Sequence, residues 1–175
     1  MKPLALLTLA AAALGVALAA PGCGADSQGA HPAAPPSPAP ALAAPAITAS
    51  AADQAAIRQT ALDYIEGWYA GDGDRMARAL HPDLAKRMVH ADRATGKSVL
   101  DQMGADKLVQ GTRRGFGKDT PPARQQKDVT ILDVFEGAAS VKIVASDWID
   151  YLHMARFDGR WVIINVLWEL KPGAH

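Results

Sequence analysis

The second half of the chain carries the hydrophobic pattern of a β-meander. Runs rich in β-branched and aromatic residues follow one another at residues 129–135, 138–146, 148–157 and 161–170. Two of the connections, Glu136-Gly137 and Asp158-Gly159, place an acidic residue before a glycine. Such pairs tolerate the positive φ that tight hairpin turns require. The pattern therefore predicts four strands joined in sequence.

Residues 52–70 have a helical period instead. Apolar positions recur there at steps of three and four, which places them on one stripe of an amphipathic helix: Ile57, Ala61, Tyr64, Ile65 and Trp68. Two glycines and an aspartate at residues 71–73 should end this helix. A second short helix is expected over residues 75–80, where His81-Pro82 stops it, because the residue before a proline avoids helical dihedrals.

The middle of the chain is less regular. Residues 85–89 fit either a short strand or a helical turn, and the polar residues 92–97 fit a turn or hairpin tip. Leu100, Met103, Leu108 and Val109 have roughly helical spacing, interrupted at Gly104. They favour a third helix near residues 105–114. Helices followed by a meander predict an α+β domain whose N-terminal helices pack on one face of a mainly antiparallel sheet.

The first fifty residues differ in composition from the rest. Residues 1–22 have the layout of a signal peptide, with Lys2 before an apolar stretch and small residues after it. Cleavage after a small-x-small site would give a secreted protein. Gly22-Cys23 instead fits a lipoprotein signal, in which Cys23 is lipidated and anchors the chain to a membrane. We expect export, either to the periplasm or to the membrane surface.

Residues 23–50 are rich in Ala and Pro and predict a disordered linker, so the folded domain should span residues 51–172. Cys23 is the single cysteine, which excludes a disulfide within the chain and thiol catalysis in the domain. The formal net charge is zero, which argues against a nucleic-acid partner. The motifs of phosphate loops, nucleophile elbows and zinc sites are missing, so we expect no cofactor and no metal.

Several short motifs together resemble the nuclear transport factor 2-like superfamily, over residues 52–172. They are Tyr64-x-x-Gly67-x-x-x-Gly71-Asp72, then Leu80-His81-Pro82-Asp83-Leu84, and finally Asp158-Gly159-x-Trp161-x-Ile163. Asp150-Tyr151-Leu152 and Val166-Leu167-Trp168 look most like its lumazine-binding branch. The resemblance implies a strongly curved sheet that wraps around the helices as a cone with a pocket. The superfamily includes isomerases, SnoaL-like cyclases, dehydratases and domains that only bind, so the fold leaves the function open.

Residues of the last strand are candidates for the pocket wall. Alternation puts Trp161 and Asn165 on one face of this strand, and the resemblance places its middle along the cavity. A buried amide such as Asn165 must be hydrogen-bonded, either to a ligand or to the protein. Both faces of the strand are mostly apolar, which predicts a homodimer through the outer face of the sheet or, alternatively, an exposed patch on a monomer.

Three more residues complete the predicted pocket. Tyr64 and Trp68 lie four apart on the first helix and could present a hydroxyl and an indole to a flat ligand. Asp150 shares one face of its strand with Leu152 and Met154. In a dry pocket its pKa would rise and it could act as a general base; a salt bridge or a position on the sheet surface is the other interpretation.

The sequence therefore predicts an exported domain that binds a small, largely apolar or aromatic ligand without catalysis. One alternative is a cofactor-free isomerase, dehydratase or cyclase with Asp150 as base and Tyr64 or Asn165 stabilising an oxyanion. A second is a protein-interaction module that uses the outer face of the sheet.

Overall fold

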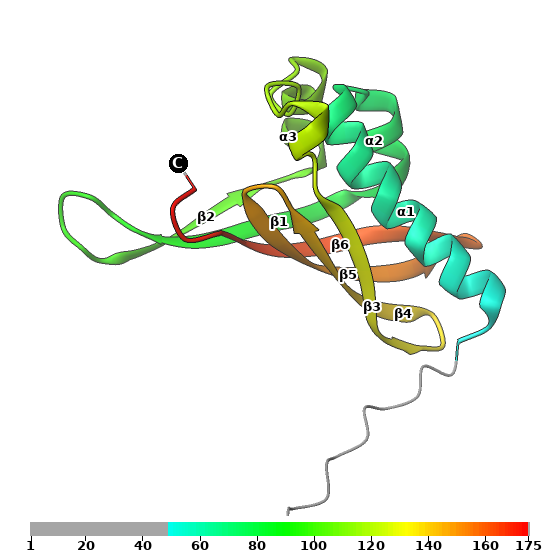
Figure 1. The fold of residues 1–175 in the computed structure, drawn as a ribbon. Helices are drawn as coiled ribbons and strands as arrows, with labels where there is room; N and C mark the ends of the chain where they lie inside the picture. The colour runs from blue at the N-terminus through cyan, green and yellow to red at the C-terminus, as the bar shows by residue number, and fades with distance from the viewer. Residues whose placement is uncertain (1–48, 175) are drawn as a thin grey trace, which may run out of the picture. The chain divides into compact units, whose positions relative to one another are not determined.

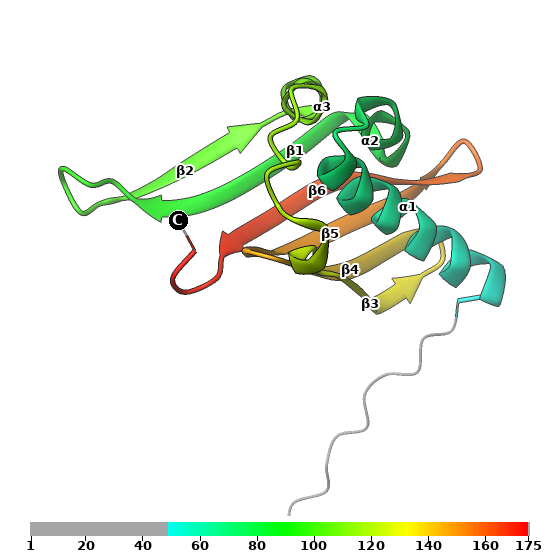
Figure 2. The ribbon, with the colours of Figure 1, turned by 45° about the horizontal axis from the view of Figure 1, so that its top comes forward.

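A computed structural model describes residues 49–174. Three helices pack on one face of a six-stranded mixed sheet that is not closed (Figures 1 and 2). The predicted signal peptide, the lipidation site Cys23 and nearly all of the linker lie outside the described residues. Within residues 49–174, no helix is both long enough and apolar enough to span a membrane.

The first two helices begin and end where their capping residues require. Helix α1 (Ala51–Ala70) starts after Ser50, whose side chain accepts a hydrogen bond from the Asp53 backbone amide at 3.1 Å. It ends at Gly71, whose φ of 67° is left-handed and favours glycine. Helix α2 (Gly73–Ala79) is capped by the Asp72 carboxylate, which accepts from two backbone amides.

The strands are β1 (Leu80–Ala91), β2 (Ser98–Met103), β3 (Lys127–Phe135), β4 (Ala138–Ala145), β5 (Trp148–Phe157) and β6 (Arg160–Leu170). Helix α3 (Ala105–Arg113) and the short 3₁₀-helix η1 (Pro122–Arg124) lie between β2 and β3. The sheet order is β2-β1-β6-β5-β4-β3. Strands β1 and β6 pair in parallel, and all other neighbouring strands are antiparallel.

The predicted α+β class and the four-stranded meander are confirmed. The middle of the chain is more extended than its sequence suggests, because residues 85–89 belong to a twelve-residue strand and residues 98–103 form β2. The helical spacing of Leu100 and Met103 is misleading: both lie on β2, which pairs with β1 as a hairpin that projects beyond the helices (Figure 1). Cross-strand pairing outweighs local spacing here.

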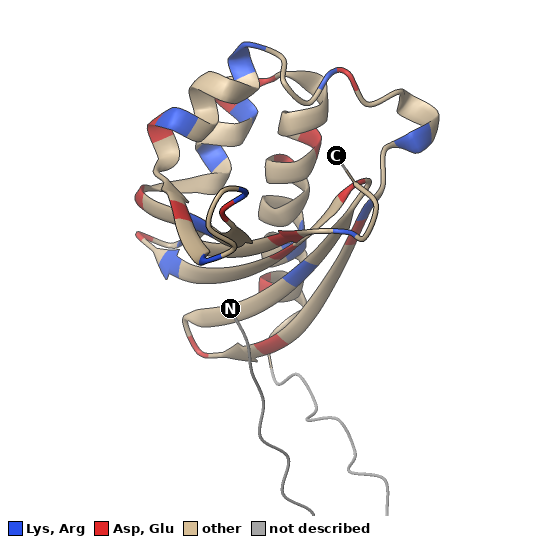
Figure 3. Ribbon diagram, turned by 90° about the vertical axis from the view of Figure 1, so that its left-hand side faces the viewer, with Lys and Arg blue, Asp and Glu red and all other residues tan. Residues whose placement is uncertain are grey.

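The hydrophobic core lies between the helices and the concave face of the sheet, which curls toward them (Figure 3). Its large fully buried apolar side chains come from α1, α2 and the three strands β4, β5 and β6: Ile57, Ile65, Met76, Val141, Ile143, Leu152, Met154, Ile163 and Val166. On β5 the alternation is regular, with Asp150, Leu152 and Met154 buried and Tyr151 and His153 exposed. Asp150 therefore shares the inner face with Leu152 and Met154, as the alternation predicts, and the structure shows that this face is turned to the helices.

A bulge in β6 changes the predicted faces of that strand. Met154 pairs with Ile163 but His153 pairs with Asn165, so Ile164 is an extra residue in β6. Trp161 and Ile163 point into the core, whereas Asn165, two residues further on, no longer shares their face. The strict alternation of faces predicted for β6 is therefore wrong beyond Ile164.

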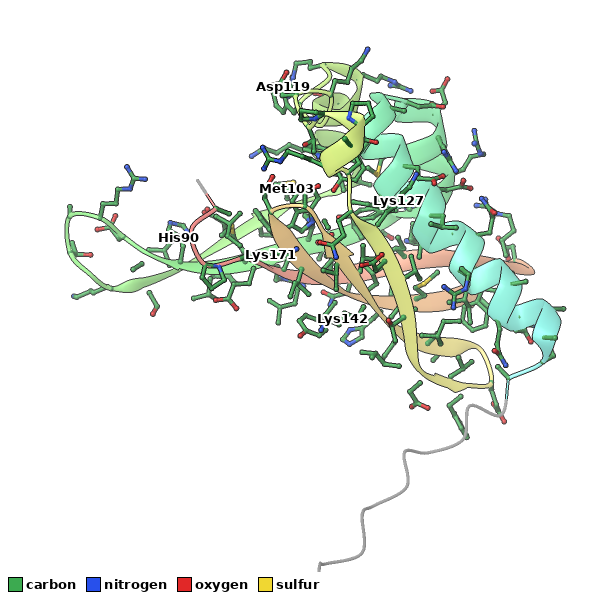
Figure 4. All side chains as sticks on the ribbon, viewed as in Figure 1. His90, Met103, Asp119, Lys127, Lys142 and Lys171 are labelled. Atoms are coloured by element: carbon green, nitrogen blue, oxygen red, sulfur yellow. The ribbon has the colours of Figure 1, made fainter. Side chains whose placement is uncertain are left out.

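The outer face of the sheet exposes Tyr151 and Leu167, which pair with each other across β5 and β6. Lys142 of β4 lies over the Tyr151 ring on the same face, opposite the helices (Figure 4). The homodimer expected through this face stays a prediction.

Candidate functional site

A cavity of about 510 Å³ lies between the sheet and the helical layer. Its walls are mainly aromatic and apolar side chains from α1, α2, α3, the turn after α3 and the ends of β2, β5 and β6: Tyr64, Trp68, Met76, Met103, Leu108, Phe116, Trp148 and Trp168. Three of the four tryptophans of the chain therefore line one space. The volume lies within the range of about 300–1,000 Å³ that is typical of small-molecule sites.

Lys86 is the only lysine or arginine among residues 49–174 that is buried, and it lies on the cavity wall. Its Nζ donates to the Asp150 carboxylate at 2.5 Å and to the Tyr64 hydroxyl at 2.7 Å. It also lies 4.8 Å from the centre of the Trp168 ring. The cation is thus held by one carboxylate, one hydroxyl and one aromatic face.

Asp150 collects the other hydrogen bonds of this network. It accepts from the Trp148 indole N–H at 2.6 Å and from the Tyr64 hydroxyl at 3.4 Å, in addition to Lys86. Its side chain is 0% exposed and does not reach the cavity wall. A buried carboxylate with three donors is satisfied, which offsets much of the cost of removing it from water.

Three elements bring these residues together. On β1, alternation turns Lys86 inward between Leu84 and Met88, and on β5 it places Trp148 and Asp150 two residues apart on the same face. Tyr64 lies on the buried stripe of α1. No pair among β1, β5 and α1 is adjacent in sequence, so the network is a product of the tertiary fold.

Burial dominates the electrostatics of the network. Desolvation lowers the pKa of the Lys86 ammonium below its ordinary value, although the adjacent Asp150 carboxylate acts in the opposite direction. Desolvation, followed by the negative charge of Asp150, raises the pKa of the Tyr64 phenol well above its ordinary value. Tyr64 therefore stays protonated at physiological pH and remains a hydrogen-bond donor.

The rim of the cavity is charged and exposed. Lys107, Arg114 and Arg124 contribute three cations, and Asp119 and Asp147 contribute two carboxylates. Met103 and Asp119 both lie on the helical side of the sheet (Figure 4). Since Arg124 and Asp147 form a loose pair at 3.7 Å, the remaining rim charges favour an acidic ligand weakly.

The residues predicted for the pocket fall in three places. Tyr64 and Trp68 line the cavity. Asp150 lies behind its wall and contacts it through Lys86 and Tyr64. Trp161 and Asn165 do not line it, in contrast to the prediction.

Trp161 packs near the start of α1, where its indole donates to Asp53 at 3.1 Å. Along α1, Asp53 is about three helical turns from Tyr64. Asn165 accepts from Arg87 at 2.8 Å and contacts the His153 ring at 3.2 Å. The bulge in β6 accounts for the position of Asn165 outside the cavity. Of the two alternatives for Asn165, the structure supports the satisfied structural amide.

Lys86 and the rim were not identified from the sequence. Lys86 stands in the otherwise mostly apolar run Leu84-Ala85-Lys86-Arg87-Met88-Val89, and a lysine at an inward position of such a strand is a usable signal. To use this signal, residues 85–89 must first be assigned as a strand, and the local pattern left that assignment open. Among residues 49–174, no group of three or more His, Cys, Asp or Glu side chains is placed to hold a metal ion.

Comparison with known proteins agrees with this architecture. The family model described as "Putative lumazine-binding" matches residues 52–169. No curated protein matches the sequence.

Solved structures with the same fold include a nuclear transport factor 2-like protein of unknown function from Shewanella baltica. It is 20% identical, with a TM-score of 0.58, over 72% of this chain and 99% of that one. A second such protein, from Methylobacillus flagellatus, is 20% identical, with a TM-score of 0.55, over 71% and 97% of the two chains.

A third, from Novosphingobium aromaticivorans, is described as having a cystatin-like fold. It is 12% identical, with a TM-score of 0.50, over 70% of this chain and 84% of that one. At these identities the likeness establishes the fold alone. Together with the family match, it agrees with the resemblance noted in the sequence: the chain belongs to the "Putative lumazine-binding" family and has the fold of nuclear transport factor 2-like proteins.

Proposed function

We propose that this domain binds a small, flat aromatic molecule that carries a hydrogen-bond acceptor. The observation that carries the proposal is the tryptophan-lined cavity with one nearly buried ammonium group, that of Lys86, on its wall. Aromatic walls bind planar rings through stacking and edge contacts. A buried cation selects for an acceptor at one position of the ligand.

The geometry of Lys86 supports the second part of the proposal. An ammonium group has three N–H donors, and two of them are used by Asp150 and Tyr64. No third acceptor comes from the described part of the chain. A carbonyl, carboxylate or phenolate oxygen of a ligand in the cavity would satisfy the remaining donor.

Lumazine fits this description and is suggested by the family name. It is a planar heteroaromatic molecule with carbonyl acceptors. The aromatic walls and the Lys86 donor supply one matching partner for each of these features. We therefore take lumazine as the first probe, and 2-naphthoate as a second planar probe with an acidic acceptor.

The same geometry argues against the catalytic alternative based on Asp150. A general base must reach the proton that it removes from a substrate. Asp150 is enclosed by Lys86, Tyr64 and Trp148 and has no surface on the cavity. Binding is the function that these contacts support better.

The experiment is a titration of tryptophan fluorescence with each probe. The Trp161→Phe variant leaves the emission of the three cavity tryptophans, so any quenching there reports on the site itself. We expect saturable quenching by at least one probe. A leucine at Gly111 would fill part of the cavity, since a Cβ there already lies 3.4 Å from the Phe116 ring and 3.9 Å from Trp68.

Gly111→Leu should therefore abolish most of the quenching. Tyr151→Ala, on the outer face of the sheet, is the matched control and should leave it unchanged. Absence of saturable quenching by both probes, or equal quenching in Gly111→Leu, would refute the proposed function.

A further inference from the structure

We propose that Lys86 forms a covalent imine with aldehyde or ketone groups of aromatic molecules bound in the cavity. This inference rests on the proposed function, because the ligand must first occupy the cavity. It goes further in assigning a reaction to one atom, the Lys86 Nζ, and a chemical class, the carbonyl compounds, to the ligand.

The first argument is the position of the amine. Lys86 is 6% exposed as a residue, and it lines the cavity. A carbonyl group that entered the cavity to accept the third N–H of Lys86 would lie within contact of Nζ. The ligand geometry that satisfies the donor is therefore close to the geometry of attack.

The second argument is the proton acceptor beside the amine. Only a neutral amine attacks a carbonyl carbon, so the ammonium must first lose a proton. Asp150 lies 2.5 Å from Nζ and can take that proton directly. Burial lowers the pKa of Lys86, which brings the neutral amine within easier reach than for an exposed lysine.

The reaction balances within this network. Lys86 passes one proton to Asp150, and its nitrogen then forms a bond to the carbonyl carbon. A proton moves from nitrogen to oxygen to give a carbinolamine. The hydroxyl then takes a proton from the Tyr64 hydroxyl, which lines the cavity and regains a proton from Asp150, and it leaves as water. The product is a protonated imine, which pairs with the restored Asp150 carboxylate as the ammonium did before.

The charge of the site is thus the same before and after the reaction. The buried carboxylate never remains without a cation, which would be costly in this environment. Tyr64 is 2.7 Å from Nζ and holds the amine in place. Its raised pKa keeps its proton available as a donor throughout.

Lys107 also lines the cavity, but it differs from Lys86 in its burial and in its lack of an adjacent carboxylate among the described residues. It is exposed at the rim, and no salt bridge to it occurs within the described residues. Lys142 lies on the opposite face of the sheet (Figure 4). These two lysines serve as internal comparisons for a rim position and for a position away from the cavity.

The test is reductive trapping on the intact chain. The protein is incubated at pH 7 with 2-naphthaldehyde and sodium cyanoborohydride, and the labelled lysines are located by peptide mass spectrometry. We expect labelling of Lys86 to exceed that of Lys107 and Lys142 at least about tenfold, because the bound aldehyde is held against one amine. Added 2-naphthoate should suppress the label at Lys86 alone.

Lys86→Arg keeps a cation beside Asp150 but cannot form an imine, and it should lose the dominant label. Because the main readout is the labelling pattern of the unmodified chain, the test does not depend on whether this variant folds.

Two outcomes overturn the inference and can be told apart. If 2-naphthaldehyde quenches the cavity tryptophans saturably but Lys86 is not preferentially labelled, the imine fails while the proposed binding function stands. If lumazine, 2-naphthoate and 2-naphthaldehyde all fail to quench, the binding function fails and the imine fails with it.

Discussion

The Nζ of Lys86 and a carboxylate oxygen of Asp150 lie 2.5 Å apart, with the two side chains 7% and 0% exposed. The residues are 64 positions apart in sequence and come from strands that are separated in the sheet by β6. Lys86 lines the cavity, and Asp150 lies behind it. A buried ion pair of this kind contributes little to stability by itself, but its disruption leaves an unpaired charge in the interior.

Neutralising one partner should therefore destabilise the domain strongly. We expect Asp150→Asn to lower the free energy of unfolding by about 3–5 kcal/mol, because Lys86 would remain charged and buried. The double variant Lys86→Met with Asp150→Asn should recover much of this loss. Urea unfolding of the single and double variants measures the coupling.

The exposed pair Arg113–Asp74, at 2.7 Å with side chains 57% and 82% exposed, is the matched control. Asp74→Asn should cost at most about 1 kcal/mol. A loss of that small size for Asp150→Asn would mean that the Lys86 pair is effectively solvated.

Lys86 should also determine ligand affinity. Replacing it with Met in the Asp150→Asn background removes the donor without leaving a lone charge. A hydrogen bond from a charged group contributes about 1.5–3 kcal/mol, so 2-naphthoate should bind roughly 10–150-fold more weakly. The measurement is a fluorescence titration. Unchanged affinity would show that the acceptor of the ligand lies elsewhere, for example against the rim cations.

Glu66 should make stability depend on acid pH. Its carboxylate accepts from Lys127 at 2.8 Å and from Arg75 at 2.5 Å, and these hydrogen bonds hold its pKa below the ordinary value. A carboxyl group with a lowered folded pKa stabilises the fold above its unfolded pKa. That stabilisation is lost as the pH falls through the folded pKa.

The stability difference between the unmodified chain and Glu66→Gln should therefore be constant from pH 7 to 6 and shrink below about pH 4.3. Thermal unfolding across pH 7 to 3 measures it. Asp133→Asn, at an exposed position on β3, is the control. A difference that persists unchanged to pH 3 would contradict the assignment.

Gly67 should resist substitution although it lies inside a helix. Alanine is normally favoured over glycine there by about 1 kcal/mol. A Cβ at Gly67, however, would lie 3.0 Å from the Met76 backbone nitrogen and 3.2 Å from the Asp72 carbonyl oxygen, neither of which can move freely. We expect Gly67→Ala to destabilise the domain by about 1–3 kcal/mol in urea unfolding.

Gly111→Ala on α3 provides the comparison, because its Cβ would make only ordinary contact with Phe116 at 3.4 Å. This variant should be neutral or slightly stabilising. Equal effects at both glycines would mean that α1 and α2 can separate at little cost.

Local pattern was sufficient for much of the architecture. The alternation in β5 predicts that Asp150 shares one face with Leu152 and Met154, and the helical stripe of α1 predicts that Tyr64 and Trp68 lie on one side of the helix. The turns at Glu136 and Asp158 have the positive φ values, 48° and 49°, that their sequences predict. These features depend on residues close in sequence, so the chain encodes them directly.

The chemistry of the site was decided by contacts between distant segments. The parallel pairing of β1 with β6 brings Lys86 to the inner face beside Asp150, and nothing local to residues 85–89 distinguishes that strand from a helical turn. The bulge after Ile163 moves Asn165 to Arg87 and His153, away from the cavity. Strand partners and bulges are selected by the packing of the whole sheet. For that reason the sequence alone determined the helical stripe that carries Tyr64 and Trp68, whereas only the tertiary structure placed the Lys86–Asp150 pair beside it.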